Sequence, residues 1–208
     1  NEISYKPSDE NIKSYFDSNS TSPIFTLYFS NEKLIGENNK IITNKKLVGG
    51  MTSRLLNVYI KNIEPFNVFY VDYLCVDKSK RNQGVAPQII QTHVYNTRRI
   101  NNNIKVFLFK KDANLNSIVP LTLYLTNSYN IKDWDLPKVI HPSFNILELN
   151  KQTLQLFFEY IDTYNPFKCY ISCNPESLLN LIDKQSIFGY IARNNTIVVG
   201  VYLFRNSN

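Results

Sequence analysis

Cysteine and histidine are scarce in this sequence. The 208-residue chain contains 3 Cys and 2 His. Cys75, Cys169 and Cys173 are too few, and odd in number, to imply a disulfide framework, so a reducing compartment such as the cytoplasm is expected. Neither His93 nor His141 stands at a metal-ligand spacing from these cysteines. No metal site is therefore expected.

Long apolar runs and concentrated charge are also missing. No run approaches the ~20 apolar residues that a membrane-spanning helix requires, and neither a membrane span nor a signal peptide is expected. The net charge of +6 permits an anionic partner without identifying one. Lysines and arginines are dispersed, apart from a cluster at Lys78, Lys80 and Arg81. Zinc-finger spacings and aromatic RNA-binding patterns are absent, so nucleic acid is not an expected partner.

The size and composition are those of one folded domain, or slightly more. Strands are expected at 22–30, 46–62, 66–77 and 104–111, and helices at 8–19, 86–102, 150–165 and 174–185. Three other stretches are a polar turn at 31–44, a short helix after Pro120 within 117–131, and a hairpin at 186–206 that turns at 193–195. The order strand, helix, strand over 66–111 predicts a βαβ unit. The expected fold class is α/β (α+β), with a mixed central sheet flanked by helices.

The C-terminal third resembles the opening of the chain. In each, a helix precedes a strand that begins Ser-Ile-Phe or Ser-Pro-Ile-Phe, followed by a polar turn and a β-branched strand containing Val-Gly. Either this is a weak internal repeat, or two ordinary helix–hairpin units resemble each other by chance.

A basic turn joins the strand at 66–77 to the helix that follows it. Gly84 lets the backbone bend there and approach a ligand closely. The first amides of a helix lack intrahelical partners and carry the positive end of the helix dipole. Such a turn forms a cradle suited to a phosphate or pyrophosphate, and the neighbouring lysines attract the anion. Pro87 is tolerated in the first helical turn, because its missing N–H costs little there. The alternative is a plain strand-to-helix turn with an ordinary cap.

The turn resembles the pyrophosphate loop of the N-acetyltransferase superfamily known as GNAT. In that loop Arg or Gln is followed by x-x-Gly-x-Gly or x-x-Gly-x-Ala, and Arg81, Gly84 and Ala86 match these positions. The wider stretch is similar to the eukaryotic N-myristoyltransferases, whose signature joins a strand NFLCV, a charged segment HKKLR and a helix start APVLI. The matching residues are Asp72–Val76, Asp77–Arg81 and Ala86–Ile90, and 46–60 resembles the strand before them. Pro87 favours the myristoyltransferases, because few acetyltransferases carry it. The resemblance covers roughly 46–111.

The resemblance implies the GNAT fold and an acyl-CoA co-substrate, either myristoyl-CoA or acetyl-CoA. The implied acceptor is an amine, either a peptide N-terminus or a small amine. The backbone N–H groups of Tyr73 and Leu74 match an oxyanion hole for the thioester carbonyl. Tyr124 either protonates the departing thiolate or is a packed core tyrosine. The residues implied to bind CoA are Val76, Lys80, Arg81, Asn82, Gln83, Gly84, Val85, Ala86 and Pro87.

Two positions depart from the myristoyltransferase pattern. Asp72 stands where that family has Asn, and Phe109 stands near a family Thr. Asp72 is either a general base for the amine or a surface or ion-paired carboxylate. A long acyl chain requires an apolar tunnel, and the aromatic residues of 21–30 and 66–76 either line one or belong to the core.

The resemblance divides the chain into two expected parts. The first is a GNAT-like acyl-CoA-binding domain at 1–145, and the second is a helix–helix–hairpin extension at 146–208 that resembles the start of another GNAT half. The expected function is N-myristoyltransferase-like acyl transfer from CoA to an amine. The alternatives are an acetyl-CoA-dependent N-acetyltransferase and an inactive GNAT-fold binding module.

Overall fold

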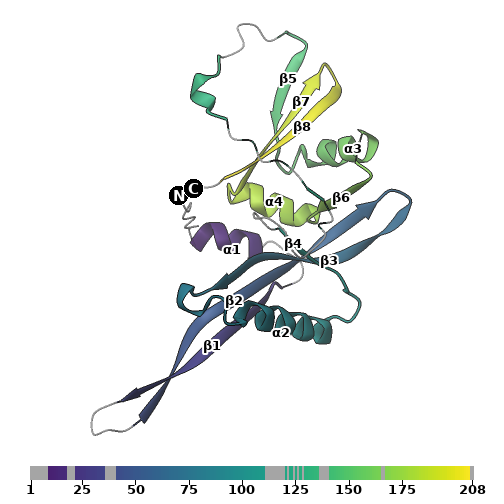
Figure 1. The fold of residues 1–208 in the computed structure, drawn as a ribbon. Helices are drawn as coiled ribbons and strands as arrows, with labels where there is room; N and C mark the ends of the chain where they lie inside the picture. The colour runs from purple at the N-terminus through teal and green to yellow at the C-terminus, as the bar shows by residue number, and fades with distance from the viewer. Residues whose placement is uncertain are drawn as a thin grey trace.

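The chain forms two β-sheets with helices between and beside them (Figure 1). The structure is a computed structural model that describes residues 9–17, 22–35, 41–110, 120, 122–123, 125, 127, 129–135, 141–164 and 167–206. The first elements are α1 (Asp9–Asp17), β1 (Ile24–Ile35), β2 (Ile41–Ile60), β3 (Ile63–Val76), the 3-10 helix η2 (Lys78–Lys80), α2 (Val85–Ile100) and β4 (Phe107–Phe109). The remaining elements are η3 (Ile131–Asp133), β5 (Phe144–Glu148), α3 (Leu154–Tyr164), β6 (Cys169–Ser172), α4 (Pro175–Asp183), β7 (Ile187–Asn194) and β8 (Ile197–Arg205).

The larger sheet has five strands and contains the expected βαβ unit. Its order is β1-β2-β3-β4, with β6 paired to β2 at residues 57–60. The pairs β1–β2 and β2–β3 are antiparallel, whereas β3 and β4 are parallel and are joined by α2. The mixed sheet and its flanking helices confirm the expected fold class.

One face of α2 packs against this sheet. The buried residues of the helix are Val85, Ile89, His93 and Thr97, each four residues after the last. Ile89 packs closely over β2, since a Cβ added to Gly49 would lie 2.7 Å from the Ile89 Cδ1 atom. Glycine at position 49 therefore lets the helix approach the strand.

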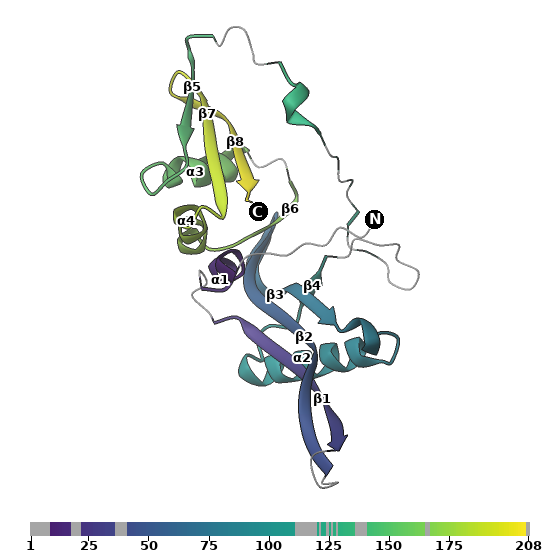
Figure 2. The same cartoon turned by 90° about the vertical axis from the view of Figure 1, so that its left-hand side faces the viewer.

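The smaller sheet has three strands in the order β5-β7-β8. Its core contains Ile191 of β7, Phe157 of α3, Leu178 of α4 and Leu149, the residue after β5. Figures 1 and 2 place α1 and α4 between the two sheets, and α2 on the far side of the larger sheet. A buried hydrogen bond of 2.6 Å between the hydroxyls of Ser14 and Ser186 joins α1 to the residue before β7.

The two hairpins β1–β2 and β7–β8 share a detail of register. In each, the Val of the Val-Gly pair has no partner on the other strand of its hairpin, so that Val48 and Val199 are bulge residues there. A helix precedes each hairpin, α1 in the first case and α4 in the second. A common bulge at the same place in two units favours an internal repeat over a chance resemblance.

Three local expectations were wrong. The polar stretch 31–44 belongs largely to strands, because β1 and β2 continue to the pair Ile35 and Ile41 as an exposed hairpin arm. The described residues between Pro120 and Asn130 lie in no helix or strand, so the expected short helix is not found among them. The second hairpin turns at 195–196, after β7 has continued to its pair with Ile197. Strand pairing extended the strands beyond what local polarity indicated.

The division of the chain at 145 stays a prediction. Strand β6 follows that position in the chain yet pairs with β2 of the larger sheet. The expected boundary in sequence therefore does not coincide with a boundary between the two sheets.

Candidate functional site

Strand β3 contains a bulge next to the predicted site. Thr52 pairs with Tyr73 and Ser53 pairs with Val71, so Asp72 has no cross-strand partner. The extra residue shifts the alternation of side chains between the two faces of β3 by one position. The side chains of Asp72 and Tyr73 consequently lie on the same face of the sheet, the face that meets α1.

The bulge also decides where the backbone N–H groups of β3 point. Asp77 donates its N–H to the Val48 carbonyl oxygen of β2 at 2.8 Å. N–H groups alternate between the two edges of a strand, and the register from Tyr73 to Val76 has no further shift. Leu74 and Val76 therefore direct their N–H groups away from β2, whereas Tyr73 directs its N–H toward β2.

The edge of β3 that Leu74 faces carries no paired strand beyond Val71 among the described residues, and is called the open edge below. Strand β4 ends at Phe109, which pairs with Val71 of β3. No described residue pairs with β3 on that edge beyond Val71. The Leu74 amide is thus placed to donate to a carbonyl oxygen that enters between β3 and the end of β4. The part predicted for the Tyr73 amide stays a prediction.

The turn after β3 is shaped by local hydrogen bonds. The Asp77 carboxylate accepts bonds from the Ser79 N–H at 2.8 Å and the Ser79 hydroxyl at 2.7 Å, and these bonds lower the pKa of Asp77. The Gln83 side-chain amide donates to the Ser79 carbonyl oxygen at 3.0 Å. Asn82 and Gly84 have φ angles of 61° and 75° in the left-handed region, which glycine and asparagine tolerate best. Local hydrogen bonds and two left-handed residues therefore define the path of the turn into α2.

The backbone amides of this turn have no acceptor within the described part of the chain. Among the residues that the structure describes, none accepts a hydrogen bond from the N–H groups of Asn82, Gln83, Gly84, Val85 and Ala86. Pro87, the third residue of α2, has no N–H to satisfy. A Cβ atom added to Gly84 would meet nothing within 4 Å. The turn therefore combines three features that an anion cradle uses: backbone donors without an acceptor among the described residues, the helix dipole, and open space beside Gly84.

The basic residues of the cluster lie around the turn. Arg81 donates from Nε to the Val76 carbonyl oxygen at 3.4 Å, so its side chain lies along the end of β3. Lys78 and Lys80 belong to η2 and are next to the turn in sequence. Their charge adds to the positive end of the α2 dipole.

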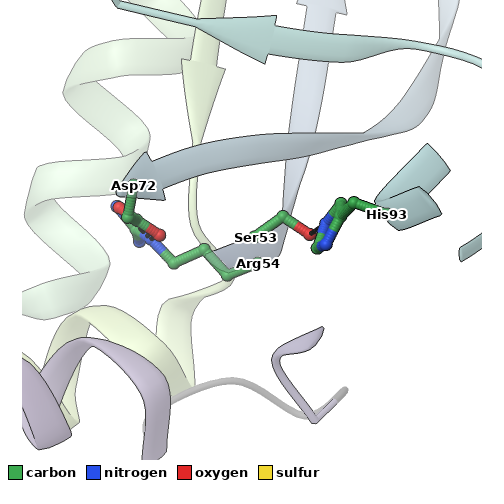
Figure 3. A network of polar contacts seen from close by, with 4 residues as sticks. All are labelled: Ser53, Arg54, Asp72 and His93. Atoms are coloured by element: carbon green, nitrogen blue, oxygen red, sulfur yellow. Dashed lines mark hydrogen bonds and ion pairs between the residues drawn. The ribbon is translucent and has the colours of Figure 1, made fainter. Parts of the chain in front are cut away.

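Asp72 forms an ion pair with Arg54 (Figure 3). The Arg54 Nε donates to both carboxylate oxygens of Asp72, at 3.0 Å and 2.9 Å. Their side chains are 13% and 12% exposed, so the pair is largely removed from water. Burial raises the pKa of Asp72, although the neighbouring Arg54 and Arg205 charges oppose that shift. Of the two roles considered for Asp72, the structure contains the ion-paired one.

A second polar network lies on the opposite face of β2. Ser53 follows Met51 on the face toward α2, where its hydroxyl bonds to the His93 Nε2 atom at 2.7 Å (Figure 3). The Thr26 hydroxyl bonds to the His93 Nδ1 atom at 2.8 Å. His93 is fully buried, and burial lowers its pKa, so the ring is neutral at pH 7. The hydroxyl partners of His93 come from two strands that are distant in the chain, and they left no signal in the sequence.

Among the aromatic residues of 21–30, Tyr28 packs against the buried cluster of Met51, Val71, Val85 and Ile89, whereas Phe25 and Phe29 are half exposed. Phe25, Leu27 and Phe29 are about half exposed, at 54%, 55% and 50%. Leu27 borders a shallow hollow of about 250 Å³, which Leu47, Val48, Gly49, Gly50, Cys75 and Asp77 also line. In 66–76, by contrast, Val68, Phe69 and Val71 are buried in the core.

The structure brings most of the predicted site residues together at one end of β3. Leu74 and Val76 lie at its open edge, and 80–87 form the turn and the first turn of α2. Tyr124 lies outside the described residues. In the described ranges, no three His, Cys, Asp or Glu side chains gather as metal ligands, and no helix is both long and apolar enough to cross a membrane.

These features define a class. A mixed sheet that opens at the end of a bulged strand, followed by a glycine-containing turn into a helix, is the acyl-CoA N-acyltransferase fold, also called the GNAT fold. The expectation of this fold, with a likeness to the N-myristoyltransferases, is confirmed. No protein-family model matches the sequence.

The proteins that this chain resembles include N-myristoyltransferases. The chain is 28% identical over 135 residues to a protein of Amsacta moorei entomopoxvirus named "Putative glycylpeptide N-tetradecanoyltransferase", covering 62% of this chain and 42% of that protein. One structure of Saccharomyces cerevisiae N-myristoyltransferase with bound myristoyl-CoA superposes with a TM-score of 0.54 at 20% identity, covering 77% of this chain and 42% of that one. Another superposes with a TM-score of 0.56 at 17% identity, covering 95% and 58%. The chain thus spans about half the length of these proteins.

Proposed function

We propose that this chain contains the acyl-CoA site of an N-acyltransferase that transfers an acyl group from a CoA thioester to an amine. One observation carries the proposal: the edge of β3 beside Leu74 and the amides of residues 82–86, which have no acceptor among the described residues, lie on either side of the same strand-to-helix turn. A thioester and a pyrophosphate are parts of the same CoA molecule. Two donor sites on one short segment therefore suit a single acyl-CoA.

The reaction needs few groups from the protein. The amine nitrogen attacks the thioester carbonyl carbon, the new C–N bond forms, and the carbonyl oxygen gains negative charge. The Leu74 N–H, directed at the open edge, would stabilise that oxyanion. The C–S bond then breaks, the amine loses a proton, and CoA leaves as the thiol, so the products are an amide and CoA. Binding both substrates side by side supplies much of the acceleration.

The finer proposal is a myristoyl-CoA co-substrate and a peptide with an N-terminal glycine. Its support is the likeness to the entomopoxvirus protein and to the yeast enzyme whose structures contain myristoyl-CoA. The motif Asp72–Val76 followed by Ala86–Ile90 supports it as well, because Pro87 sits at the third position of α2.

Calorimetry with CoA, acetyl-CoA and myristoyl-CoA tests the proposal directly. We expect binding of myristoyl-CoA, and release of CoA thiol when a peptide with an N-terminal glycine is added. A preference for acetyl-CoA would assign the chain to acetyl transfer. Binding without thiol release would indicate a binding module, and binding of none of the three would disprove an acyl-CoA site.

A further inference from the structure

The unpaired residue of the β3 bulge is held by a charged partner on β2. Arg54 pairs with Tyr70 across the strands, and its guanidinium reaches along the face of the sheet to Asp72. One nitrogen, Nε, donates to both carboxylate oxygens. Both oxygens of Asp72 are therefore occupied by Arg54.

Arg54 is itself held by aromatic rings from two elements. Its guanidinium lies over the Tyr15 ring of α1 at 5.3 Å and over the Tyr70 ring of β3 at 5.7 Å. Arg205 of β8 lies over the same Tyr15 ring at 4.6 Å. Such cation–π contacts are stronger where water is excluded, and Arg54 is mostly buried. The position of Arg54 is thus set by contacts with α1 and with its own sheet, next to β8 of the smaller one.

The bulge at Asp72 has a consequence for the Leu74 amide. Before the bulge, Phe69 donates its N–H to the Val106 carbonyl oxygen at 3.0 Å, on the β4 side. Without a bulge, the N–H groups of odd-numbered residues would continue to point toward the β4 side, and the Leu74 N–H would point toward β2. Because two consecutive residues, Asp72 and Tyr73, face β2, Leu74 faces the open edge instead.

We propose that Arg54 is a positioning residue, which holds the Asp72 bulge so that the Leu74 N–H faces the open edge. This inference rests on the proposed function, which puts the thioester carbonyl at that edge. A largely buried ion pair adds little to stability compared with apolar packing, but it can select one backbone arrangement. Asp72 then acts through the strand geometry and does not remove a proton from the amine.

Substitutions at both residues test this assignment. The variants are Arg54→Met, which keeps much of the side-chain volume without the donor, and Asp72→Asn, which keeps an oxygen acceptor without the charge. Arg98→Met, at an exposed position on α2, is the matched control. Hydrogen–deuterium exchange of the peptide 70–76 reports on the bulge whether or not the protein is active. Steady-state kinetics with the acyl-CoA reports on the part that the Leu74 N–H plays in the reaction.

In Arg54→Met we expect the peptide 70–76 to exchange at least tenfold faster, while peptides from α3 and β7 exchange as in the wild type. We expect kcat to fall tenfold or more, with KM for the acyl-CoA changed less than threefold, because the turn that holds pyrophosphate is untouched. In Asp72→Asn, the exchange rate of the peptide 70–76 should stay within about twofold of the wild-type rate, and kcat should stay within about tenfold of the wild-type value. Arg98→Met should match the wild type in both measurements.

Wild-type exchange of 70–76 in Arg54→Met would overturn the proposal, and so would faster exchange throughout the chain, which would indicate a general part in folding. A hundredfold or greater loss of kcat in Asp72→Asn with normal exchange would also overturn it, since a general base contributes about that much or more. If the wild-type chain binds no acyl-CoA, the proposed function fails, whereas the exchange data still decide whether Arg54 holds the bulge.

Discussion

Gly84 offers the sharpest test of the anion cradle, because strain, bulk and charge can be separated there. Its φ of 75° lies in the left-handed region, and a Cβ added to it would meet nothing within 4 Å. Any other residue therefore costs backbone strain of about 1 kcal/mol but no steric clash with the protein. Three substitutions separate the effects: Gly84→Ala adds strain, Gly84→Gln adds strain and bulk, and Gly84→Glu adds a negative charge as well.

The expected loss of CoA affinity in Gly84→Glu follows from the position of Gly84 among the amides of residues 82–86. If they hold a pyrophosphate, the carboxylate that Gly84→Glu introduces would lie about 5 Å from roughly two negative charges. At an effective dielectric constant between about 20 and 80, the repulsion is about 2–6 kcal/mol. Since each 1.4 kcal/mol is a factor of about ten in affinity, Gly84→Glu should bind CoA at least ~30-fold more weakly than Gly84→Gln.

Calorimetry with CoA and thermal unfolding together measure these effects. All three variants should unfold about 2–4 °C below the wild type, because the strain of about 1 kcal/mol is common to them. Raising the salt concentration should narrow the affinity gap between Gly84→Gln and Gly84→Glu, because screening weakens the repulsion. Equal CoA affinity of these two variants at low salt would refute the assignment of this turn to the pyrophosphate.

Three further predictions concern stability. Burial lowers the pKa of His93 in the folded protein, so the unfolded chain binds a proton at this ring more tightly. The stability that the neutral ring contributes is therefore complete above about pH 6.5, the ordinary pKa of histidine, and is lost as the pH falls through the folded pKa. The free energy of unfolding should decrease by at most about 1.4 kcal/mol per pH unit in this window. In urea unfolding, the free energy of unfolding of His93→Gln should depend less on pH than that of the wild type. An equal dependence in both proteins would contradict the role given to the neutral His93 ring. Gly189→Ala should cost about 1–3 kcal/mol in urea unfolding, because the new Cβ would lie 2.5 Å from the Leu149 Cδ2 atom and 2.6 Å from the Leu149 Cβ atom. The cost should shrink in a Leu149→Gly background, which removes both atoms, and a cost unchanged there would exclude this contact. Asn174→Ala should lose about 1 kcal/mol of unfolding free energy, since Asn174 accepts the Ser177 N–H at 2.7 Å, whereas Asn174→Asp should lose little; equal losses would mean that the cap is not the cause.

The strands and helices that the sequence predicted best are those with strong local signals. The strand expected at 66–77 lies within β3 apart from its last residue, and the helix expected at 86–102 became α2. The helix expected from residue 174 begins as α4 at Pro175 with Asn174 as its N-cap, because a cap and a proline in the first turn are local features. The predictions that failed, at 31–44 and at the second hairpin turn, concern ends of strands, which depend on pairing with a distant segment.

By itself, the sequence determined that a basic, glycine-containing turn joins a buried strand to a helix, and that this unit resembles an acyl-CoA site. Backbone angles and helix dipoles arise from neighbouring residues, so a short motif is enough to specify them. Only the tertiary structure decided which amides are open. The bulge at Asp72 and the end of β4 at Phe109 depend on the register with other strands, and the Arg54 contact depends on α1 and β8 packing over the sheet. Register and packing join residues far apart in the chain, so the direction of the Leu74 N–H was not readable from the motif that contains it.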